Sequence, residues 1–262
     1  MTLTLESIQT GTTQRPPRIV LVGTEKVGKS TFASQAPSAV IIPIKGEEGI
    51  DDLDVAKFPR AESYSDVLEA MRSLYKGEHE YRVVVIDSAS ALEPLIWQHV
   101  CAEKYWKSIE APGFGKGYVE AARYWRELTN AIDLLREERK MACIVIGHVK
   151  AKLINDPLTD PYDAFVFDVH DRASSILYRW SDSILFATRR VITRKAEISH
   201  GREVTRAVGE DESVLYTRSR PSHPGGGRGA YGHLDYELPL NWNAFAQSLS
   251  NARQNGKEQN DG

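Results

Sequence analysis

The sequence has little cysteine, no long apolar run and no strong excess of charge of one sign. Its two cysteines, Cys101 and Cys143, stand in unrelated segments, so neither a disulfide framework nor a cysteine metal knuckle is indicated. This usage fits a reducing cytoplasm. No stretch approaches the roughly 18 apolar residues of a membrane span. The N-terminus lacks a charged start followed by an apolar run, so we expect neither a membrane protein nor a secretory signal.

The charge balance narrows the class of partner. With a formal net charge of −3, the 262-residue chain is not a polycation, and any contact with nucleic acid requires a local basic patch. The apolar content of 41% is enough for a substantial core, in one large α/β domain or two small ones.

Four short segments rich in Val and Ile predict buried strands: 18–23, 39–44, 82–88 and 142–148. They are continuously apolar, as strands covered on both faces require. Segments 63–76 and 118–140 carry apolar residues at helical spacing between them. Alternating strands and helices predict an α/β fold with a mainly parallel, doubly wound sheet flanked by helices.

The pattern changes after residue 150. Two Asp-Pro turn signals and poor periodicity predict an irregular loop over 151–172. Short antiparallel strands are expected toward the C-terminus, over 183–196, 203–209 and 212–220 with a turn at 199–201, and then a helix over 241–252. We expect a loosely ordered lead-in (1–16), one core domain (17–248) and a disordered tail (249–262).

A phosphate-binding loop follows the first predicted strand. The segment "GTEKVGKST" fits G-x-x-x-x-G-K-[ST], and its candidate nucleotide-binding residues are Gly23, Thr24, Glu25, Lys26, Val27, Gly28, Lys29, Ser30 and Thr31. Glycines let backbone N–H groups turn toward phosphate oxygens, and the start of the next helix adds favourable partial charge. Lys29 would reach the β and γ phosphates. The alternative is a glycine turn that holds nothing.

A carboxylate ends the third predicted strand. Asp87 in "VVVIDS" is costly at an apolar strand end unless a cation or partner lies nearby. A Mg²⁺ ion shared with the Ser30 hydroxyl would supply that cation. The alternative is that Asp87 caps the following helix. Together the two motifs predict ATP and Mg²⁺ as ligands.

Hydrolysis also needs a group that orients or deprotonates water. The segment after the second strand offers Glu47 and Glu48, of which we favour Glu47 as the base. His148, at the end of the fourth strand, is a candidate sensor of the γ-phosphate. The alternatives are a solvated acidic loop and a structural histidine.

In their order along the chain, the P-loop, "EEG", "VVVIDSAS", "GFGKGY" and "IVIGHVK" resemble the RecA-core ATPases, over roughly 17–245. The phage branch of nucleotide-binding or Sak-type single-strand annealing ATPases is the nearest likeness, on "GKGY" and Lys26. The resemblance implies a RecA-like P-loop NTPase fold and a DNA-stimulated ATPase of phage recombination or replication in the bacterial host cytoplasm. It also implies a homo-oligomer and a single-strand binding or other replication protein as partner. Filament, ring and short oligomer all stay open.

Single-stranded DNA has three candidate contact regions. Segment 189–206 carries six basic and two acidic residues, among them Arg194 and Lys195, and could track phosphates as a basic hairpin. The resemblance places DNA loops after the third and fourth strands, at Lys107, Lys116 and Tyr118 and at Lys150 and Lys152. A solvated charged hairpin is the alternative for the first region.

Three arginines suggest a contact between subunits. Arg218, Arg220 and Arg228 lie near where RecA-like proteins place basic fingers that reach a neighbour's γ-phosphate, although a mobile basic loop is equally consistent. Annealing or strand exchange on single-stranded DNA is the leading functional hypothesis. A nucleotide-gated loader or scaffold with slow turnover is the alternative, and a small-molecule P-loop kinase is a weaker one.

Overall fold

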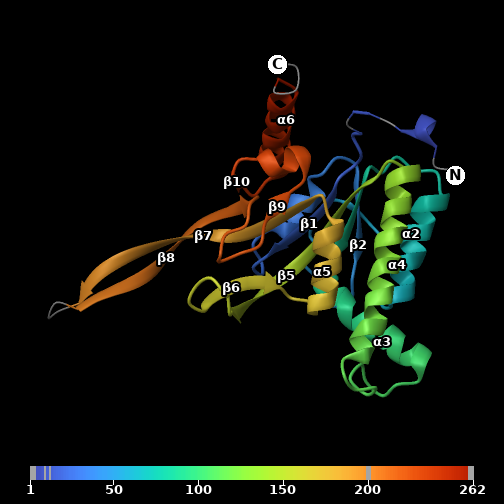
Figure 1. Cartoon of the computed structure of the whole chain (residues 1–262), viewed down its shortest axis with the longest axis horizontal. Coiled ribbons are helices and arrows are strands. Elements are labelled where there is room, and N and C mark those ends of the chain that lie inside the picture. Colours follow the sequence, from blue (N-terminus) through green and yellow to red (C-terminus); the bar gives the residue numbers. More distant parts are fainter. Residues whose placement is uncertain (1–3, 9, 12, 199–201, 259–262) are drawn as a thin grey trace.

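A mainly parallel sheet forms the centre of the structure (Figure 1), a computed structural model that describes residues 4–8, 10–11, 13–198 and 202–258. Its parallel strands include β1 (Arg18–Gly23), β2 (Ala39–Pro43), β3 (Ala56–Lys57), β4 (Val83–Asp87) and β5 (Ala142–Ile154). The sheet order is β10-β8-β7-β1-β5-β4-β2-β3. The four predicted buried strands are therefore confirmed as β1, β2, β4 and the first half of β5.

Both faces of the parallel strands are buried, which explains their continuous apolar sequence. In β1, Val20 and Val22 contribute to one core cluster, whereas Ile19 and Leu21 contribute to a second cluster on the opposite face. Alternate residues of a strand point to opposite faces, so a strand between two helical layers must be apolar at every position.

Helices supply the two layers. One face carries α2 (Tyr64–Lys76), α3 (Ala89–Lys104), α4 (Lys116–Glu138) and α5 (Asp171–Trp180). The other carries α1 (Lys29–Ser34) and α6 (Trp242–Glu258), through Phe32 and Phe245. Ser63 caps the start of α2: its hydroxyl accepts the Asp66 N–H while the Asp66 carboxylate accepts the Ser63 N–H.

The predicted irregular loop over 151–172 is wrong. Strand β5 continues to Ile154 and forms an antiparallel hairpin with β6 (Tyr162–Phe167), and α5 follows from Asp171. The two turn signals occupy the short connection between the strands. Most side chains in the outer half of β5 are exposed, so this part of the strand lacks the apolar pattern of a buried one.

A long hairpin replaces the several short strands expected after residue 183. Strands β7 (Ser183–Ile198) and β8 (Arg202–Tyr216) pair along most of their length and extend away from the body of the molecule (Figure 1). The predicted turn at 199–201 lies outside the described residues. Short strands β9 (Gly226–Gly227) and β10 (Glu237–Pro239) pair with β7 and β8, respectively.

The C-terminal segment differs from the predicted disordered tail. Near the N-terminus a short 3-10 turn, η1 (Leu5–Ser7), precedes β1, and a second, η2 (Gly229–His233), precedes β10. Helix α6 runs to Glu258, so the segment from 249 is helical rather than a disordered tail as far as that residue. Leu249 packs against the core and Ala252 is buried, which explains why the segment from 249 is held as helix rather than as a disordered tail.

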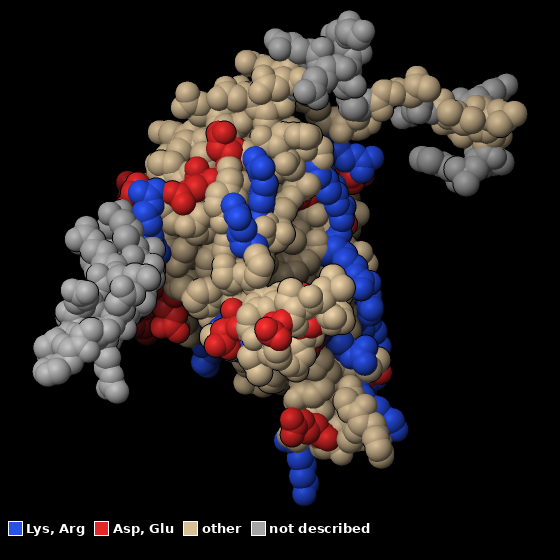
Figure 2. All heavy atoms as spheres, turned by 60° about the vertical axis from the view of Figure 1, so that its left-hand side comes forward, with Lys and Arg blue, Asp and Glu red and all other residues tan. Residues whose placement is uncertain are grey.

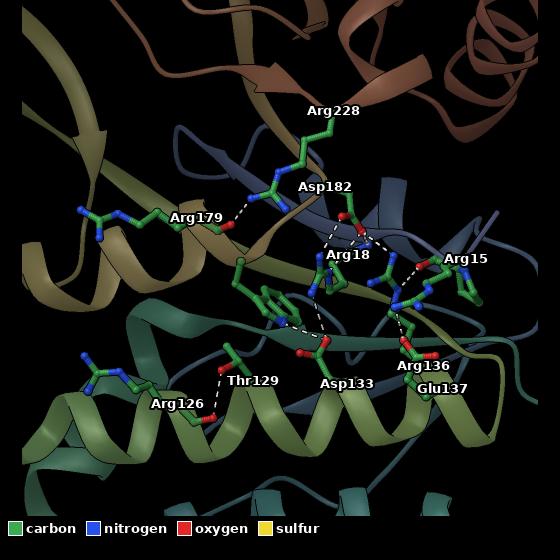
Figure 3. Close-up of polar contacts among 12 residues, drawn as sticks. Arg15, Arg18, Arg126, Thr129, Asp133, Arg136, Glu137, Arg179, Asp182 and Arg228 are labelled. Carbon is green, nitrogen blue, oxygen red and sulfur yellow. Dashed lines mark hydrogen bonds and ion pairs between the residues drawn. The ribbon is translucent and has the colours of Figure 1, made fainter. Parts of the chain in front are cut away.

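A network of ion pairs joins the elements at the amino-terminal edge of the parallel strands (Figure 3). Arg18 at the start of β1 contacts Asp182 before β7 at 2.9 Å and Asp133 of α4 at 3.2 Å. Arg136 of α4 also binds Asp182, at 3.0 Å. Trp180 donates its indole N–H to Asp133. The charges of the two arginines and the two carboxylates cancel, so we interpret this network as one that stabilises the fold.

Among the described residues, none of the helices combines the length and the apolar character needed to cross a bilayer.

Candidate nucleotide-binding and hydrolysis site

The polar residues singled out in the sequence gather at the carboxyl-terminal edge of the parallel sheet. Gly23 ends β1, Asp87 ends β4, and the segment with Glu47 follows β2. His148 pairs in register with Gly23 across β5 and β1. Ends of parallel strands meet at one edge, which is where open α/β sheets bind ligands.

Glycine is required at the two motif positions for different physical reasons. A Cβ at Gly23 would lie 2.1 Å from the carbonyl oxygen of Ala187 on β7, so only glycine allows the two strands to approach. Gly28 has φ 107°, in the left-handed region that favours glycine, and its added Cβ would meet nothing closer than 3.6 Å. Gly23 therefore serves packing, whereas Gly28 sets the turn of the loop into α1.

Lys29 is buried, with 5% of its surface exposed. Its ammonium donates to the carbonyl oxygens of Gly23 at 3.1 Å and Thr24 at 2.8 Å. Burial lowers the pKa of Lys29, and the nearby carboxylates of Asp87 and Glu47 oppose that shift. The loop therefore folds around its own lysine. A phosphate would add a third and charged partner.

Ser30 and Asp87 form a direct pair. The Ser30 hydroxyl donates to Oδ2 of Asp87 at 2.6 Å. Burial raises the pKa of Asp87, the hydrogen bond from Ser30 opposes this shift, and the charge of Glu47 adds to it. A buried carboxylate beside a hydroxyl offers the oxygen ligands that Mg²⁺ prefers. The pair therefore fits the magnesium that the sequence predicts, and bound Mg²⁺ would neutralise phosphate charge.

Glu47 lies at the centre of a hydrogen-bonded group. Its Oε1 accepts the Ser88 hydroxyl at 2.5 Å and lies 2.9 Å from Nε2 of His148. Burial opposes ionisation of Glu47, but the hydrogen bonds from His148 and Ser88 outweigh it, so the pKa of Glu47 is lowered. Glu48 is exposed. The geometry therefore separates the two glutamates: the favoured Glu47 is hydrogen-bonded within the site, and Glu48 is not part of this group.

Sequence reasoning missed two serines that hold this group. Ser88 binds Glu47 and also accepts the N–H of Ala91, as the N-cap of α3. Ser90 accepts the backbone N–H of His148 at 3.0 Å. Both lie in "IDSAS", directly after Asp87, and a serine at the junction of a strand and a helix is a recognisable cap signal.

The side chains of the other predicted loop residues do not join this hydrogen-bonded group. Glu25, Lys26 and Thr31 are exposed, and Val27 packs into the core.

The predicted DNA residues of the α3–α4 connection split into two groups. Lys107 and Lys116 are exposed. Tyr118 instead packs against His170, the N-cap of α5, with ring centroids 4.2 Å apart, and donates its hydroxyl to Glu110 at 3.0 Å. Its ring is thus already stacked within the protein, whereas the two lysines are available on the surface.

The lysines after the fourth strand are neutralised. Lys150 pairs with Asp168 at 2.9 Å and Lys152 with Asp171 at 3.4 Å, on the β5–β6 hairpin and the start of α5. The side chains of Arg194 and Lys195 lie outside what the structure describes, although their backbone belongs to β7.

Of the three candidate trans-acting arginines, Arg228 lies at the amino-terminal edge of the parallel strands, where its backbone N–H donates to the carbonyl of Asp182. Arg218 donates to the carbonyl of Leu234, and Arg220 stacks over Tyr236 at 4.5 Å. Arg228 donates to the carbonyl of Arg179 at the end of α5. In this arrangement none of the three serves the nucleotide site of its own chain.

Fold and site together define a P-loop ATPase: an α/β protein with a phosphate-binding loop, a strand-end aspartate and a hydrogen-bonded glutamate at one sheet edge. The family model described as AAA domain matches residues 15–229, most of the chain, and the protein belongs to that family. No curated protein matches it. A solved structure, the crystal structure of the RadB recombinase, is similar over 67% of this chain and 76% of its own, with a TM-score of 0.39 and 15% identity.

Proposed function

We propose that this protein is a Mg²⁺-dependent ATPase of RecA-like type that acts on single-stranded DNA in phage recombination or replication, by annealing or strand exchange. The observation that carries the ATPase part is the convergence of Lys29, Ser30, Asp87 and Glu47 at one sheet edge. These are the groups that phosphoryl transfer to water requires: a phosphate cradle, metal ligands and a base.

In the proposed site, each residue has a distinct task. The loop 23–31 surrounds the phosphates, and Lys29 turns its ammonium from backbone carbonyls toward the β and γ oxygens. Ser30 and Asp87 hold Mg²⁺, which supplies positive charge against the phosphates. Glu47 orients the attacking water and accepts its proton.

The contact between Glu47 and His148 suggests how DNA would stimulate turnover. A carboxylate with two donors on one oxygen and a lowered pKa is ionised but a weak base. His148 lies on β5, the strand that continues into the β5–β6 hairpin. DNA that displaced this hairpin would move His148 and free Glu47 for the water.

The same contact favours one alternative. If His148 never releases Glu47, turnover stays slow and the nucleotide acts only as a gate, as in a loader or scaffold for a protein partner. Both the ATPase and the loader would assemble into a homo-oligomer, in which Arg218, Arg220 or Arg228 would reach the nucleotide of a neighbouring subunit.

ATP turnover with and without single-stranded DNA tests the proposal. We expect Mg²⁺-dependent phosphate release that rises when an oligothymidine is added, and none from Lys29→Ala, which lacks the phosphate-binding ammonium. Slow turnover that DNA leaves unchanged would favour the loader. Absence of ATP binding would overturn both.

A further inference from the structure

Four exposed arginines line one surface that crosses α4 and α5. We call Arg126, Arg172, Arg179 and Arg228 the arginine face. Arg172 and Arg179 are seven residues apart on α5, which places them on the same side of the helix about 10 Å apart along its axis. Figure 3 shows Arg126 on α4 and Arg179 on α5 pointing in the same direction, with Arg228 reaching the end of α5.

These arginines have no acidic partner among the described residues, whereas three basic residues nearby do. Nearby ion pairs are Arg123–Glu103, Lys150–Asp168 and Lys152–Asp171. Four unneutralised charges are a local excess in a chain of net charge −3. In Figure 2, Lys and Arg side chains gather in a column along one edge of the view.

Favourable charge at the end of a helix explains the positions of only two of the four arginines. The last carbonyls of α5 favour positive charge, which accounts for Arg179 and Arg228 at that end. Arg126 lies in the middle of α4, and Arg172 lies in the first turn of α5, where the helix dipole disfavours a cation. Local helix electrostatics therefore give no reason for these two.

One end of the face leads to an exposed aromatic ring. Arg172 and Tyr118 line the same small hollow between α4 and α5. Four residues before Tyr118, Phe114 is fully exposed, with φ 50° between two glycines that also have positive φ. A bulky residue rarely adopts this conformation, and here it holds an apolar ring in water.

We infer that the arginine face is a binding track for single-stranded DNA, with guanidinium groups on successive phosphates and Phe114 stacked on a base at its end. Arginine suits phosphate oxygens through its planar array of donors. A track of cations that ends in an exposed aromatic fits a single strand, whose bases are free to stack. An acidic protein segment would not use the ring in this way. This inference rests on the proposed function and adds a DNA contact on the helical face to the candidate contacts at the β5–β6 and β7–β8 hairpins.

Fluorescence anisotropy with a labelled 30-nucleotide oligothymidine, measured over a range of salt concentrations, tests the track. The variant is Arg126→Gln with Arg179→Gln, since both side chains are exposed and neither holds the core. Arg72→Gln with Lys76→Gln on α2 is the matched control, because both side chains are exposed and the variant removes the same charge from another helix. Phe114→Ala tests the ring. Thermal melting of each variant checks the fold.

Each phosphate contact on a single strand contributes about 0.7 to the log–log salt slope. Loss of Arg126 and Arg179 should therefore flatten the slope by about 1.4 and weaken binding about 25-fold near 0.1 M salt. The α2 control should retain nearly the wild-type salt slope and affinity. Phe114→Ala should weaken binding about fivefold or more with the slope unchanged.

Three results would overturn the inference, and they separate it from the proposed function. Wild-type binding by the Arg126/Arg179 variant would leave the DNA function standing but without this track. Failure of the wild-type protein to bind the oligothymidine would remove both proposals. Binding of polyglutamate as tightly as the oligothymidine, lost in the same variant, would assign the face to an acidic protein partner instead.

Discussion

At the scale of single residues, Glu47 and Glu48 form a natural comparison, because they are adjacent and chemically identical. Glu47 contacts Ser88 and His148, whereas Glu48 is exposed. We expect Glu47→Gln to retain Mg-ATP and to hydrolyse it at least about tenfold more slowly, as the loss of a general base predicts. Glu48→Gln should have a much smaller effect. Single-turnover phosphate release measures both, and the opposite ranking would assign the base to Glu48.

The pair of Ser30 and Asp87 leads to a prediction about the metal. Removal of Mg²⁺ with EDTA should reduce hydrolysis far more than nucleotide binding, because the ion chiefly neutralises charge that develops during transfer. Asp87→Asn should mimic EDTA, since an amide keeps the size of the carboxylate but not its charge. Binding of a fluorescent ATP analogue and phosphate release are the two measurements. Full activity in EDTA would contradict the assignment.

The sequence predicted some of these residues and not the contacts between them. The P-loop and Asp87 are local signals, because strand, turn and helix follow one another in the chain. The contact of Glu47 with His148 joins residues 101 positions apart. It depends on β4 lying between β2 and β5, and strand order is not encoded in any short segment.

At the scale of elements, the network at the amino-terminal edge fastens β1, β7 and α4 to one another. Asp182→Asn should cost about 3 kcal/mol of unfolding free energy, because two partly buried arginines lose their shared charged partner. Glu137→Gln is the control, since its pair with Arg15 is exposed and should contribute at most about 0.5 kcal/mol. Urea denaturation of both variants measures the difference. Equal losses would mean that the network adds little.

The same network predicts a dependence of stability on pH. Burial opposes ionisation of Asp182, but the hydrogen bonds and charge of Arg18 outweigh it and lower its pKa. A carboxyl whose pKa is lower in the folded state stabilises the fold above its unfolded value of about 3.9. This contribution is lost as the pH falls through the lower, folded value. Asp182→Asn should therefore lose less stability than the wild-type protein on acidification.

Elements were predicted well where both faces are buried and poorly where a strand leaves the body of the molecule. Strands β1, β2 and β4 are apolar at nearly every position. The outer half of β5 is mostly exposed, β6 is mostly only partly buried, and β7 and β8 extend beyond the sheet. Pairing between two such strands is satisfied by backbone hydrogen bonds, which leave little trace in the side-chain pattern.

At the scale of the whole molecule, nucleotide binding should stabilise the fold. At a Mg-nucleotide concentration of 100 times Kd, linkage adds about 2.7 kcal/mol. For a chain of this size that corresponds to a rise in Tm of roughly 5–10 °C. A slowly hydrolysed ATP analogue with Mg²⁺ is the probe, in a thermal shift assay. Lys29→Ala should show little or no rise, and an equal rise in that variant would place the phosphates elsewhere.

Strand β7 runs without interruption from the sheet centre into the projecting hairpin. Near its start, it pairs with β1, and the carbonyl of Ala187 accepts the N–H of Thr24 in the phosphate-binding loop at 3.1 Å. Its outer part is paired with β8 instead. A force applied to the hairpin would therefore be transmitted along the continuous backbone of β7 to the phosphate-binding loop.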